Sequence, residues 1–475
     1  MFVLTFLVKP FWIFGIDRAV QNQTGEQAYG FYYTLYSIAF LFSAVLDFGI
    51  NTYNTKQIAS NKHAFKDNFS ELLLTKCLLF VCYFCATLGF AFANHYNLKM
   101  IYGLCFMALN QALVGFILFL RSNLSGLHLY AADSVGSVLD RLITIMLCIP
   151  LIYTTLGNRF LSINTFIYSQ TLALMATSLL IFYWLNQQKP DYKLVWHSKQ
   201  QLVLLGQMLP FATLGLLMSF YNRIDVVLLS KFRSDVDVGI YSASYRMVDA
   251  VNMFAMLFGG LLLPMFSKLF TQNKPDELKN LVQLAAVLMF VGTYLVAVVC
   301  SVFDAELMQL LYTKSTAYYE QTFGYLIFSI IPIGSIYVFG TLLTATSELK
   351  FLNSIAAIAL LFNVSANVVG LHYFGANAVE VAKISVCTQF FVAGSHFAYS
   401  FYALKLKPNW LLMAKILVFC VLSWGGIWLG RGYFVGNTYL AVGLPMVANV
   451  ALFFGLKLLP LSYENVMDLV KKYKS

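Results

Sequence analysis

The sequence predicts an all-α, polytopic membrane protein with about 14 transmembrane helices, built as two pseudo-symmetric six-helix bundles plus a C-terminal helix pair. Of its 475 residues, 60% are hydrophobic and only 11% are charged, too few to cover the surface of a soluble protein of this size. Apolar runs of about 20 residues, the length that crosses a bilayer as a helix, recur along the whole chain. A short sequence motif, called the repeated phrase below, also occurs once in each half, which indicates a duplicated helical unit.

The repeated phrase places an aspartate before a glycine that opens an apolar run. Asp17 precedes residues 29–32, Tyr-Gly-Phe-Tyr, and Asp225 precedes residues 238–241, Val-Gly-Ile-Tyr. An arginine lies beside or near each aspartate, Arg18 and Arg223. We expect Gly30 and Gly239 each to start a helix after a short outer loop, where a small residue permits tight entry and close packing.

Apolar runs separated by short polar segments define the expected spans. We predict them at about 1–17, 28–50, 72–94, 100–121, 138–156, 162–186, 203–229, 238–266, 280–303, 321–347, 350–371, 376–403, 410–430 and 437–459. The N-terminal bundle is then 1–195, the C-terminal bundle 196–405, and the additional helix pair with its tail 406–475. Because no cleavable signal peptide is evident, we expect the first span to act as the insertion signal.

The distribution of lysine and arginine predicts the orientation in the membrane. If the N-terminus is cytoplasmic, most of the 31 lysines and arginines fall on cytoplasmic flanks, as the positive-inside rule requires. Both termini are therefore expected in the cytoplasm. Topology and contact with anionic lipid account for most of the net charge of +10, so nucleic-acid binding is not needed to explain it.

The sequence offers no pattern for a cofactor, a metal or catalysis. The eight cysteines lie in or at the edge of apolar spans, and the six histidines form no ligand cluster, so we expect neither a disulfide framework nor a metal site. No GxxxxGK[ST] phosphate loop occurs. We predict that the chain is not an enzyme, and that any uphill transport uses an ion gradient or the gradient of the substrate.

Ionisable residues within the spans are the informative ones, because each costs roughly 2.5 to 3.5 kcal/mol at a helix centre and usually faces protein or water. Lys9 precedes Pro10 in the first span, where proline bends a helix, and Pro210 occupies the equivalent seventh span. Arg246 and Asp249 are three residues apart in the eighth span. They either neutralise each other as a buried pair or present Arg246 to an anion.

Tyrosines of the second span recur at helical spacing on one face, at positions 29, 32, 33 and 36. Tyrosine is common where a helix crosses the membrane interface, and it also stacks well on sugar rings. Both interpretations stay open from the sequence.

Several segments resemble the opening of Wzx-type polysaccharide-biosynthesis flippases, members of the MATE-like MOP exporter superfamily. They are residues 9–18 (KPFWIFGIDR), 24–32 (TGEQAYGFY) and 46–50 (LDFGI), and residues 225–229 with 238–246 are similar to the seventh and eighth helices of that family. The resemblance extends over the whole chain in helix count and spacing. Its motifs are structural, so they indicate the superfamily better than the substrate.

The resemblance implies a bacterial inner-membrane flippase that moves an undecaprenyl-diphosphate-linked oligosaccharide to the periplasmic leaflet by alternating access. The product would serve O-antigen (lipopolysaccharide), capsule or exopolysaccharide assembly, with membrane lipid, a polysaccharide polymerase and chain-length machinery as partners. Carried onto this sequence, the substrate-binding candidates are Lys9, Arg18, Arg223 and Arg246. The candidates for gating or ion coupling are Asp17, Asp47, Asp225 and Asp249. The cationic candidates agree with the chemistry, because a diphosphate in a low-dielectric region needs compensating positive charge.

Three alternatives share parts of this pattern. A flippase for the peptidoglycan precursor lipid II would have the same fold and lipid carrier. A MATE-type cation or drug antiporter would carry acidic residues deep in one bundle, whereas most acids here lie at helix ends. A polymerase or ligase would need a larger outer loop than this chain provides.

Overall fold

The computed structural model describes residues 8–61, 63–154, 160–188, 198–404, 409–434 and 438–458. Within these ranges every regular element is a helix, which confirms the predicted fold class. The helices of the first part are η1 (Phe11–Asp17), α2 (Arg18–Thr24), α3 (Glu26–Leu41), α4 (Ala44–Asp47), α5 (Ile50–Ser60), α6 (His63–Ala93), α7 (Leu98–Gly126), α8 (Tyr130–Gly136), α9 (Leu139–Tyr153) and α11 (Ile163–Asn186). The remaining helices are α12 (Ser198–Phe232), α13 (Asp235–Thr271), α14 (Pro275–Val302), α15 (Asp304–Leu311), α16 (Ala317–Leu326), η2 (Ile327–Ser329), α17 (Ile330–Ala345), α18 (Leu349–Tyr373), α19 (Ala378–Ala403), α20 (Trp410–Tyr433) and α21 (Thr438–Gly455).

Ten of the described helical segments are long and apolar enough to cross a membrane, and Leu440–Gly455 is a shorter apolar helix. The chain is therefore a multi-pass membrane protein. The predicted span 376–403 also corresponds to one long helix, α19 (Ala378–Ala403), which carries Glu380 and Lys383 near its start. The exact number of fourteen spans stays a prediction, and the predicted first span lies partly outside the described residues.

The predicted second span, 28–50, is not one helix. It is interrupted after α3, and again where Phe48 and Gly49 adopt positive φ values of 49° and 82°. Glycine takes this left-handed conformation without a steric penalty. The apolar composition is as expected for a span, but two breaks divide the run into α3, α4 and the beginning of α5.

The helix after Pro10 is irregular, as the proline predicts. Residues Phe11–Asp17 form a wide-turned π-helix before regular α-helix resumes at Arg18. Proline removes one backbone donor and crowds the preceding turn, so a local change of helical pitch is expected there. By contrast, α12 continues through Pro210 without a break in its helical assignment.

Helix boundaries follow local sequence signals. Asn97 and Ser162 cap α7 and α11, because their side-chain oxygens accept the backbone N–H of Met100 and Thr165. Pro275 begins α14 with two acidic residues in the first turn, which suits the positive end of the helix dipole.

The chain forms two compact units, each described here by itself. Unit 1 comprises Met1–Ser242 and Val364–Ala378, and unit 2 comprises Ala243–Asn363 and Val379–Ser475. The predicted bundles, with boundaries at residues 195 and 405, were defined by the duplicated sequence unit, whereas the two compact units are defined by packing. The bundle boundaries stay a prediction.

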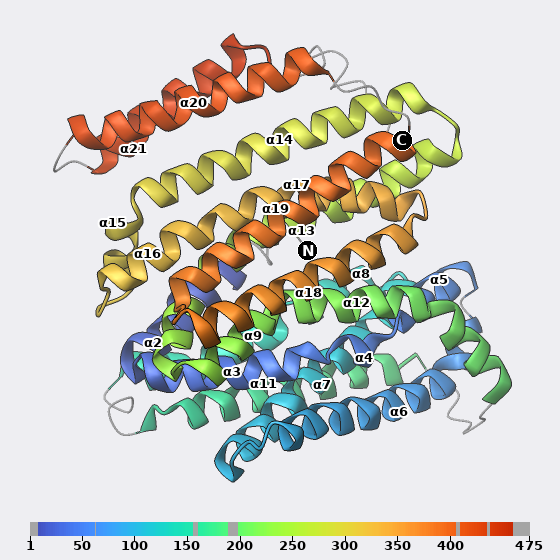
Figure 1. Cartoon of the computed structure of the whole chain (residues 1–475). Coiled ribbons are helices and arrows are strands. Elements are labelled where there is room, and N and C mark those ends of the chain that lie inside the picture. The colour runs from blue at the N-terminus through green and yellow to red at the C-terminus, as the bar shows by residue number, and fades with distance from the viewer. Residues whose placement is uncertain are drawn as a thin grey trace. The chain divides into compact units, whose positions relative to one another are not determined.

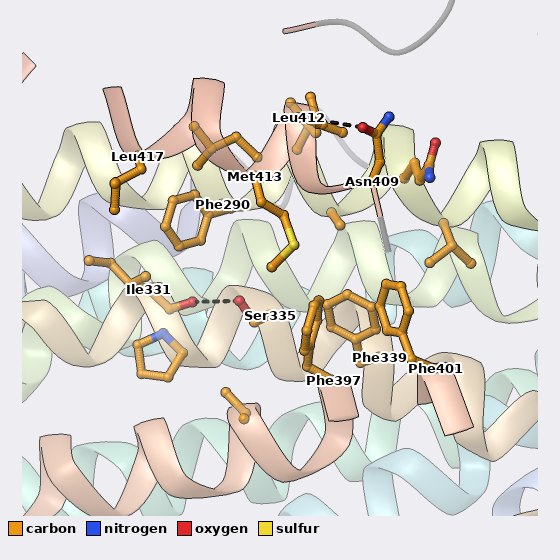
Figure 2. A pocket seen from close by; sticks show the side chains of 18 of the residues that line it. Phe290, Ile331, Ser335, Phe339, Phe397, Phe401, Asn409, Leu412, Met413 and Leu417 are labelled. Carbon is orange, nitrogen blue, oxygen red and sulfur yellow. Dashed lines mark hydrogen bonds between the residues drawn. The ribbon is translucent and has the colours of Figure 1, made fainter. Parts of the chain in front are cut away.

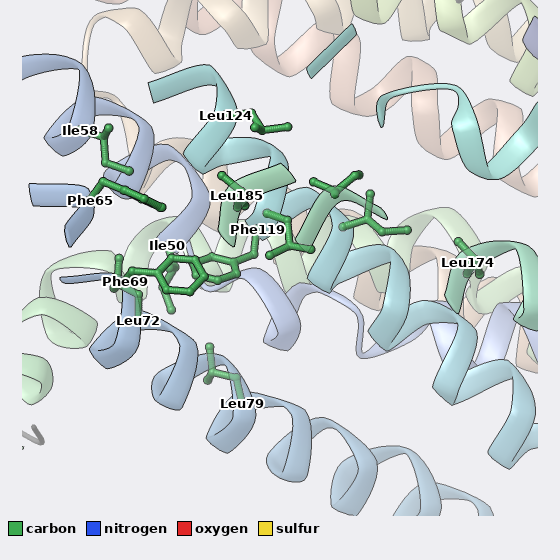
Figure 3. Close-up of a cluster of buried hydrophobic side chains, with 13 residues drawn as sticks. Ile50, Ile58, Phe65, Phe69, Leu72, Leu79, Phe119, Leu124, Leu174 and Leu185 are labelled. Carbon is green, nitrogen blue, oxygen red and sulfur yellow. The ribbon is translucent and has the colours of Figure 1, made fainter. Parts of the chain in front are cut away.

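In unit 1, α7 packs against α3, α5, α6 and α11. Figure 3 shows one apolar cluster of this unit, in which Phe65, Phe69 and Phe119 lie close together among aliphatic side chains. Phe69 and Phe119 stack with ring centroids 5.9 Å apart. The cluster joins α5, α6, α7 and α11 into one core, and these helices lie in or beside the second, third, fourth and sixth predicted spans.

In unit 2, α14 packs against α17 and against α20, and α20 pairs with α21 (Figure 1). The C-terminal helix pair is tied to the rest of unit 2 at the end of α20. There Arg431 donates to the carbonyl of Val302 and lies 3.1 Å from a carboxylate oxygen of Glu306. These contacts tie the C-terminal end of α20 to the segment where α14 ends and α15 begins.

Candidate functional site

The two copies of the repeated phrase touch each other in unit 1. A Cβ on Gly30 would lie 1.7 Å from the backbone oxygen of Asp235, and one on Gly239 would lie 2.3 Å from that of Glu26. The side chain of Gln21 also donates to the carbonyl of Gly239 at 3.0 Å. Only glycine allows the first turns of α3 and α13 to approach so closely. The expected close packing of these glycines is confirmed.

Arg223 of α12 lies in an aromatic enclosure on α3. Its guanidinium donates to the hydroxyl of Tyr33 and lies 5.4 to 5.5 Å from the ring centroids of Tyr33, Tyr36 and Phe40. The side chain is buried. Stacking over several rings offsets part of the cost of burying this charge. In this conformation Arg223 is shielded, so contact with a substrate would require the enclosure to open.

Asp225 lies two residues later on α12 and is held by neutral donors. The amide of Asn367 donates to Oδ1 at 2.9 Å, and the hydroxyl of Tyr241 donates to Oδ2 at 3.3 Å. Asp225 is only 4% exposed.

The remaining candidates of the repeated phrase lie around η1. Asp17 ends η1 and accepts a hydrogen bond of 2.9 Å from Tyr29, and Arg18 begins α2 with its Nε buried. Tyr29, Tyr32 and Tyr33 are buried and contact one another, so in this conformation these three rings are neither exposed at an interface nor open to a sugar. Lys9 is partly buried just before η1.

Asp47 of α4 forms an ion pair with Lys76 of α6. Its Oδ1 lies 3.4 Å from Nζ of Lys76 in α6, and the same Nζ donates to the carbonyl of Leu46 at 2.8 Å. The Lys76 side chain is 6% exposed and that of Asp47 is 46% exposed. The pair fastens α4 to α6 beside the break at Phe48 and Gly49.

In unit 2, Arg246 of α13 is buried and donates from Nη1 to the hydroxyl of Tyr312 at 2.8 Å. Tyr312 follows α15, in the segment between the predicted spans 280–303 and 321–347, and its ring contacts that of Tyr319. Asp249 lies one turn after Arg246 and is partly buried. The loop residue therefore positions the arginine from outside its own helix.

A largely apolar pocket of about 400 Å³ lies within unit 2, between α14, α17, α19 and α20. Figure 2 shows Met413 and Leu417 of α20 facing Phe290, Ile331 and three aromatic side chains across it. Those aromatic side chains are Phe339, Phe397 and Phe401. Asn409 and Gln283 are among its few polar lining residues. A pocket of this size and chemistry suits a flexible hydrocarbon chain.

Sequence reasoning found the ionisable residues but not their partners. Unit 1 holds Lys9, Asp17, Arg18, Asp47, Arg223 and Asp225, and unit 2 holds Arg246 and Asp249. The tyrosine spacing on α3 could have indicated the rings around Arg223. Nothing in the sequence signals Tyr312 as the partner of Arg246, because the contact joins a loop to a distant helix.

Comparison with known proteins identifies the family. Residues 19–270 match the family model described as polysaccharide biosynthesis protein, and residues 210–369 match the model described as MatE. No curated protein sequence matches the chain significantly. Since the first match covers more than half of the sequence, the chain belongs to the polysaccharide biosynthesis protein family.

Solved structures with the same fold are transporters. The lipid II flippase MurJ, in an inward closed conformation, aligns with TM-score 0.71 at 13% identity over 96% of this chain and 97% of its own. An inward-facing multidrug resistance MATE transporter of the MOP superfamily aligns with TM-score 0.66 at 14% identity over 83% and 94%. A MOP superfamily transporter from Pyrococcus furiosus gives TM-score 0.62 at 14% identity over 85% and 94%. The chain thus has the MOP transporter fold.

Proposed function

We propose that this member of the polysaccharide biosynthesis protein family is a flippase for an undecaprenyl-diphosphate-linked oligosaccharide. It would carry the repeat unit by alternating access from the cytoplasmic to the periplasmic leaflet of the inner membrane, for O-antigen, capsule or exopolysaccharide assembly. A polysaccharide polymerase and chain-length machinery would use the product.

The observation that carries this proposal is the apolar pocket against α20. Its wall includes residues 409–420 of the C-terminal helix pair, and its lining is almost wholly hydrocarbon and aromatic. A lipid-linked substrate keeps its tail in apolar surroundings while its head group crosses, so a flippase has use for such a site beside its core. A transporter of water-soluble cations has no such need.

Buried cations support an anionic head group. Arg223 and Arg246 are both buried, and each donates a hydrogen bond to a tyrosine hydroxyl, that of Tyr33 and that of Tyr312. Buried positive charge in a membrane protein is costly, and such residues commonly mark a substrate or ion pathway. We assign Lys9, Arg18, Arg223 and Arg246 to substrate contact, and Asp17, Asp47, Asp225 and Asp249 to gating or ion coupling.

Deletion of the gene tests the proposal in cells. We expect lipid-linked repeat units to accumulate on the cytoplasmic face and surface polysaccharide to be lost, with restoration by the wild-type gene. Unchanged surface polysaccharide and no accumulated intermediate would contradict it.

A lipid II flippase is the second candidate, favoured by one specific observation. The MurJ alignment includes nearly the entire chain, whereas the MATE transporter aligns with 83% of it. Depletion separates the two functions, because loss of lipid II transport arrests growth whereas loss of a surface polysaccharide does not. Resistance to cationic drugs on overexpression would instead favour an antiporter.

A further inference from the structure

Helix α19 of unit 2 carries a buried histidine whose ring makes no hydrogen bond. His396 is 1% exposed, and neither Nδ1 nor Nε2 has a partner among the residues that the structure describes. A neutral imidazole has one N–H donor and one acceptor nitrogen, so both capacities are unused. Unpaired buried polar groups are costly, and an ionisable residue inside a membrane protein usually serves a function.

Two further polar side chains lie on the same face of α19. Gln389 comes seven residues before His396 and Ser400 four residues after it, a spacing that puts all three on one side of an α-helix. Both are buried, and Oε1 of Gln389 and Oγ of Ser400 also have no partner within the described ranges. This polar face would therefore be stabilised if it opened to water.

His396 lies beside the wall of the apolar pocket. A Cβ added to Gly340 of α17 would lie 3.3 Å from Nδ1 of His396, so the glycine leaves room for the imidazole. The residues next to these two in sequence, Phe339 and Phe397, both line the pocket, and their ring centroids are 5.2 Å apart (Figure 2). The contact of His396 with Gly340 thus adjoins the aromatic pair that joins α17 to α19.

The surroundings of His396 supply no counter-charge for a protonated ring. Phe351 of α18 has its ring centroid 6.3 Å from that of the imidazole, and no carboxylate in the described part of the chain bonds to either ring nitrogen. Tyr399 donates to Glu348 at 3.0 Å, one turn away. The titratable groups within three residues of these contacts, with the titratable residue of the pocket lining, are Tyr337, Glu348, Lys350, Tyr399 and Cys420.

We propose that His396 is a proton-binding residue, and that its protonation parts α17 from α19 at Gly340 and opens this wall of the pocket. Histidine is the side chain that ordinarily changes charge between about pH 5 and about pH 8. The step adds one proton from solvent to a ring nitrogen and breaks no covalent bond. Because an imidazolium is costly in apolar surroundings, proton binding favours an arrangement in which water reaches the polar face of α19.

This inference goes beyond the proposed function, because it concerns a proton and the pocket wall and holds for any cargo. It also differs from the assignment of the aspartates to ion coupling, since those residues lie on other helices. The pocket would be closed on this side when His396 is neutral and open when it is charged. Transport would then respond to pH through α19.

Backbone hydrogen exchange of the full-length protein in zwitterionic nanodiscs tests the proton site. Exchange of residues 336–344 and 393–401 is compared at about pH 7.5 and about pH 5.5, after correction for the intrinsic effect of pH. We expect exchange in the wild type to be at least about 10-fold faster at the lower pH, because the protonated fraction rises up to about tenfold per pH unit.

Two variants separate a proton site from a packing role. His396→Phe replaces both unpaired nitrogens by an apolar ring, so it should stay folded and lose the response to pH. His372→Gln, at an exposed position on α18, is the matched control and should respond as the wild type does. Gly340→Ser places a hydroxyl beside Nδ1 that can pair with the neutral ring, so the response should weaken several-fold even if His396→Phe does not fold.

An equal acceleration in the wild type and in His396→Phe would overturn the proposal, as would no acceleration in the wild type. Acceleration spread evenly over all helices would also contradict it, because acid would then loosen the whole protein. No substrate is present in this experiment, so its failure leaves the oligosaccharide cargo untouched. Conversely, a deletion strain that keeps its surface polysaccharide contradicts the cargo and leaves the proton site standing.

Discussion

At the scale of single residues, three buried charges of this protein contact polar or aromatic side chains from distant helices and loops. Arg223 is enclosed by the rings of α3, Asp225 by Asn367 and Tyr241, and Arg246 by Tyr312. A tyrosine hydroxyl that accepts from an arginine fixes the orientation of the guanidinium and does not itself cancel its charge. Substitution of these charged residues should therefore reduce transport more than it reduces folding.

Arg246→Ala should abolish complementation of a deletion strain while membrane abundance stays normal. The reason is that this substitution removes a buried cation, whereas Tyr312→Phe removes only the hydroxyl that positions it and should reduce transport by about 10-fold or less. Immunoblots of membranes and surface-polysaccharide staining measure the two quantities. Full activity of Arg246→Ala would exclude this arginine from the mechanism.

The pair of Asp47 and Lys76 should respond asymmetrically to substitution. Asp47→Ala leaves a buried ammonium without its carboxylate and should destabilise the protein by about 2 kcal/mol. Lys76→Met leaves a carboxylate that is 46% exposed and can be hydrated, so a smaller loss is expected. Thermal unfolding in detergent compares the two variants, and the reverse order would contradict this account of the pair.

At the scale of elements, composition predicts the helices well and their interruptions poorly. Long apolar runs such as 98–126 and 275–302 are single helices, as expected. The run 28–50 is divided because Phe48 and Gly49 adopt left-handed conformations, and hydropathy does not report backbone conformation. The sequence predicted close packing at Gly30 but not that α13 is its partner. A repeated phrase does not reveal that its two copies contact each other.

Gly30→Ala and Gly239→Ala should both disturb the junction of α3 and α13. Each added methyl group would overlap a backbone oxygen, which cannot rotate away, so a cost of about 1 to 3 kcal/mol or a shift of the helices is expected. Gly89→Ala in α6 is the matched control, because its added Cβ would meet nothing within 4 Å. Equal thermal midpoints and equal transport for all three variants would show that the contact is unimportant.

At the scale of the whole molecule, the class and the family predicted from the sequence are confirmed, and the cationic candidates for substrate contact stay a prediction. The sequence did not predict the pocket, because that cavity depends on how α20 lies against α14, α17 and α19. Distances between helices far apart in the chain are set by tertiary packing, to which local residue patterns contribute little.

Filling the pocket should impair transport without unfolding the protein. Gly394 lines the cavity, and a Cβ there would meet nothing within 4 Å, so Gly394→Leu can enter the space without displacing backbone. We expect transport of the lipid-linked substrate to fall several-fold. Gly292→Leu, at an exposed and open position on α14, should transport normally. A fully active Gly394→Leu would argue against a lipid tail in this pocket.

The most direct test of the central claim is transport by the purified protein in liposomes. Undecaprenyl-diphosphate-linked oligosaccharide is incorporated into both leaflets, and its accessibility to an externally added glycosidase is followed over time. We predict that all of the substrate becomes accessible in vesicles that contain the wild-type protein, whereas only the outer-leaflet fraction does so with Arg246→Ala. Accessibility confined to the outer leaflet with a folded wild-type protein, or movement of lipid II alone, would contradict the proposed cargo.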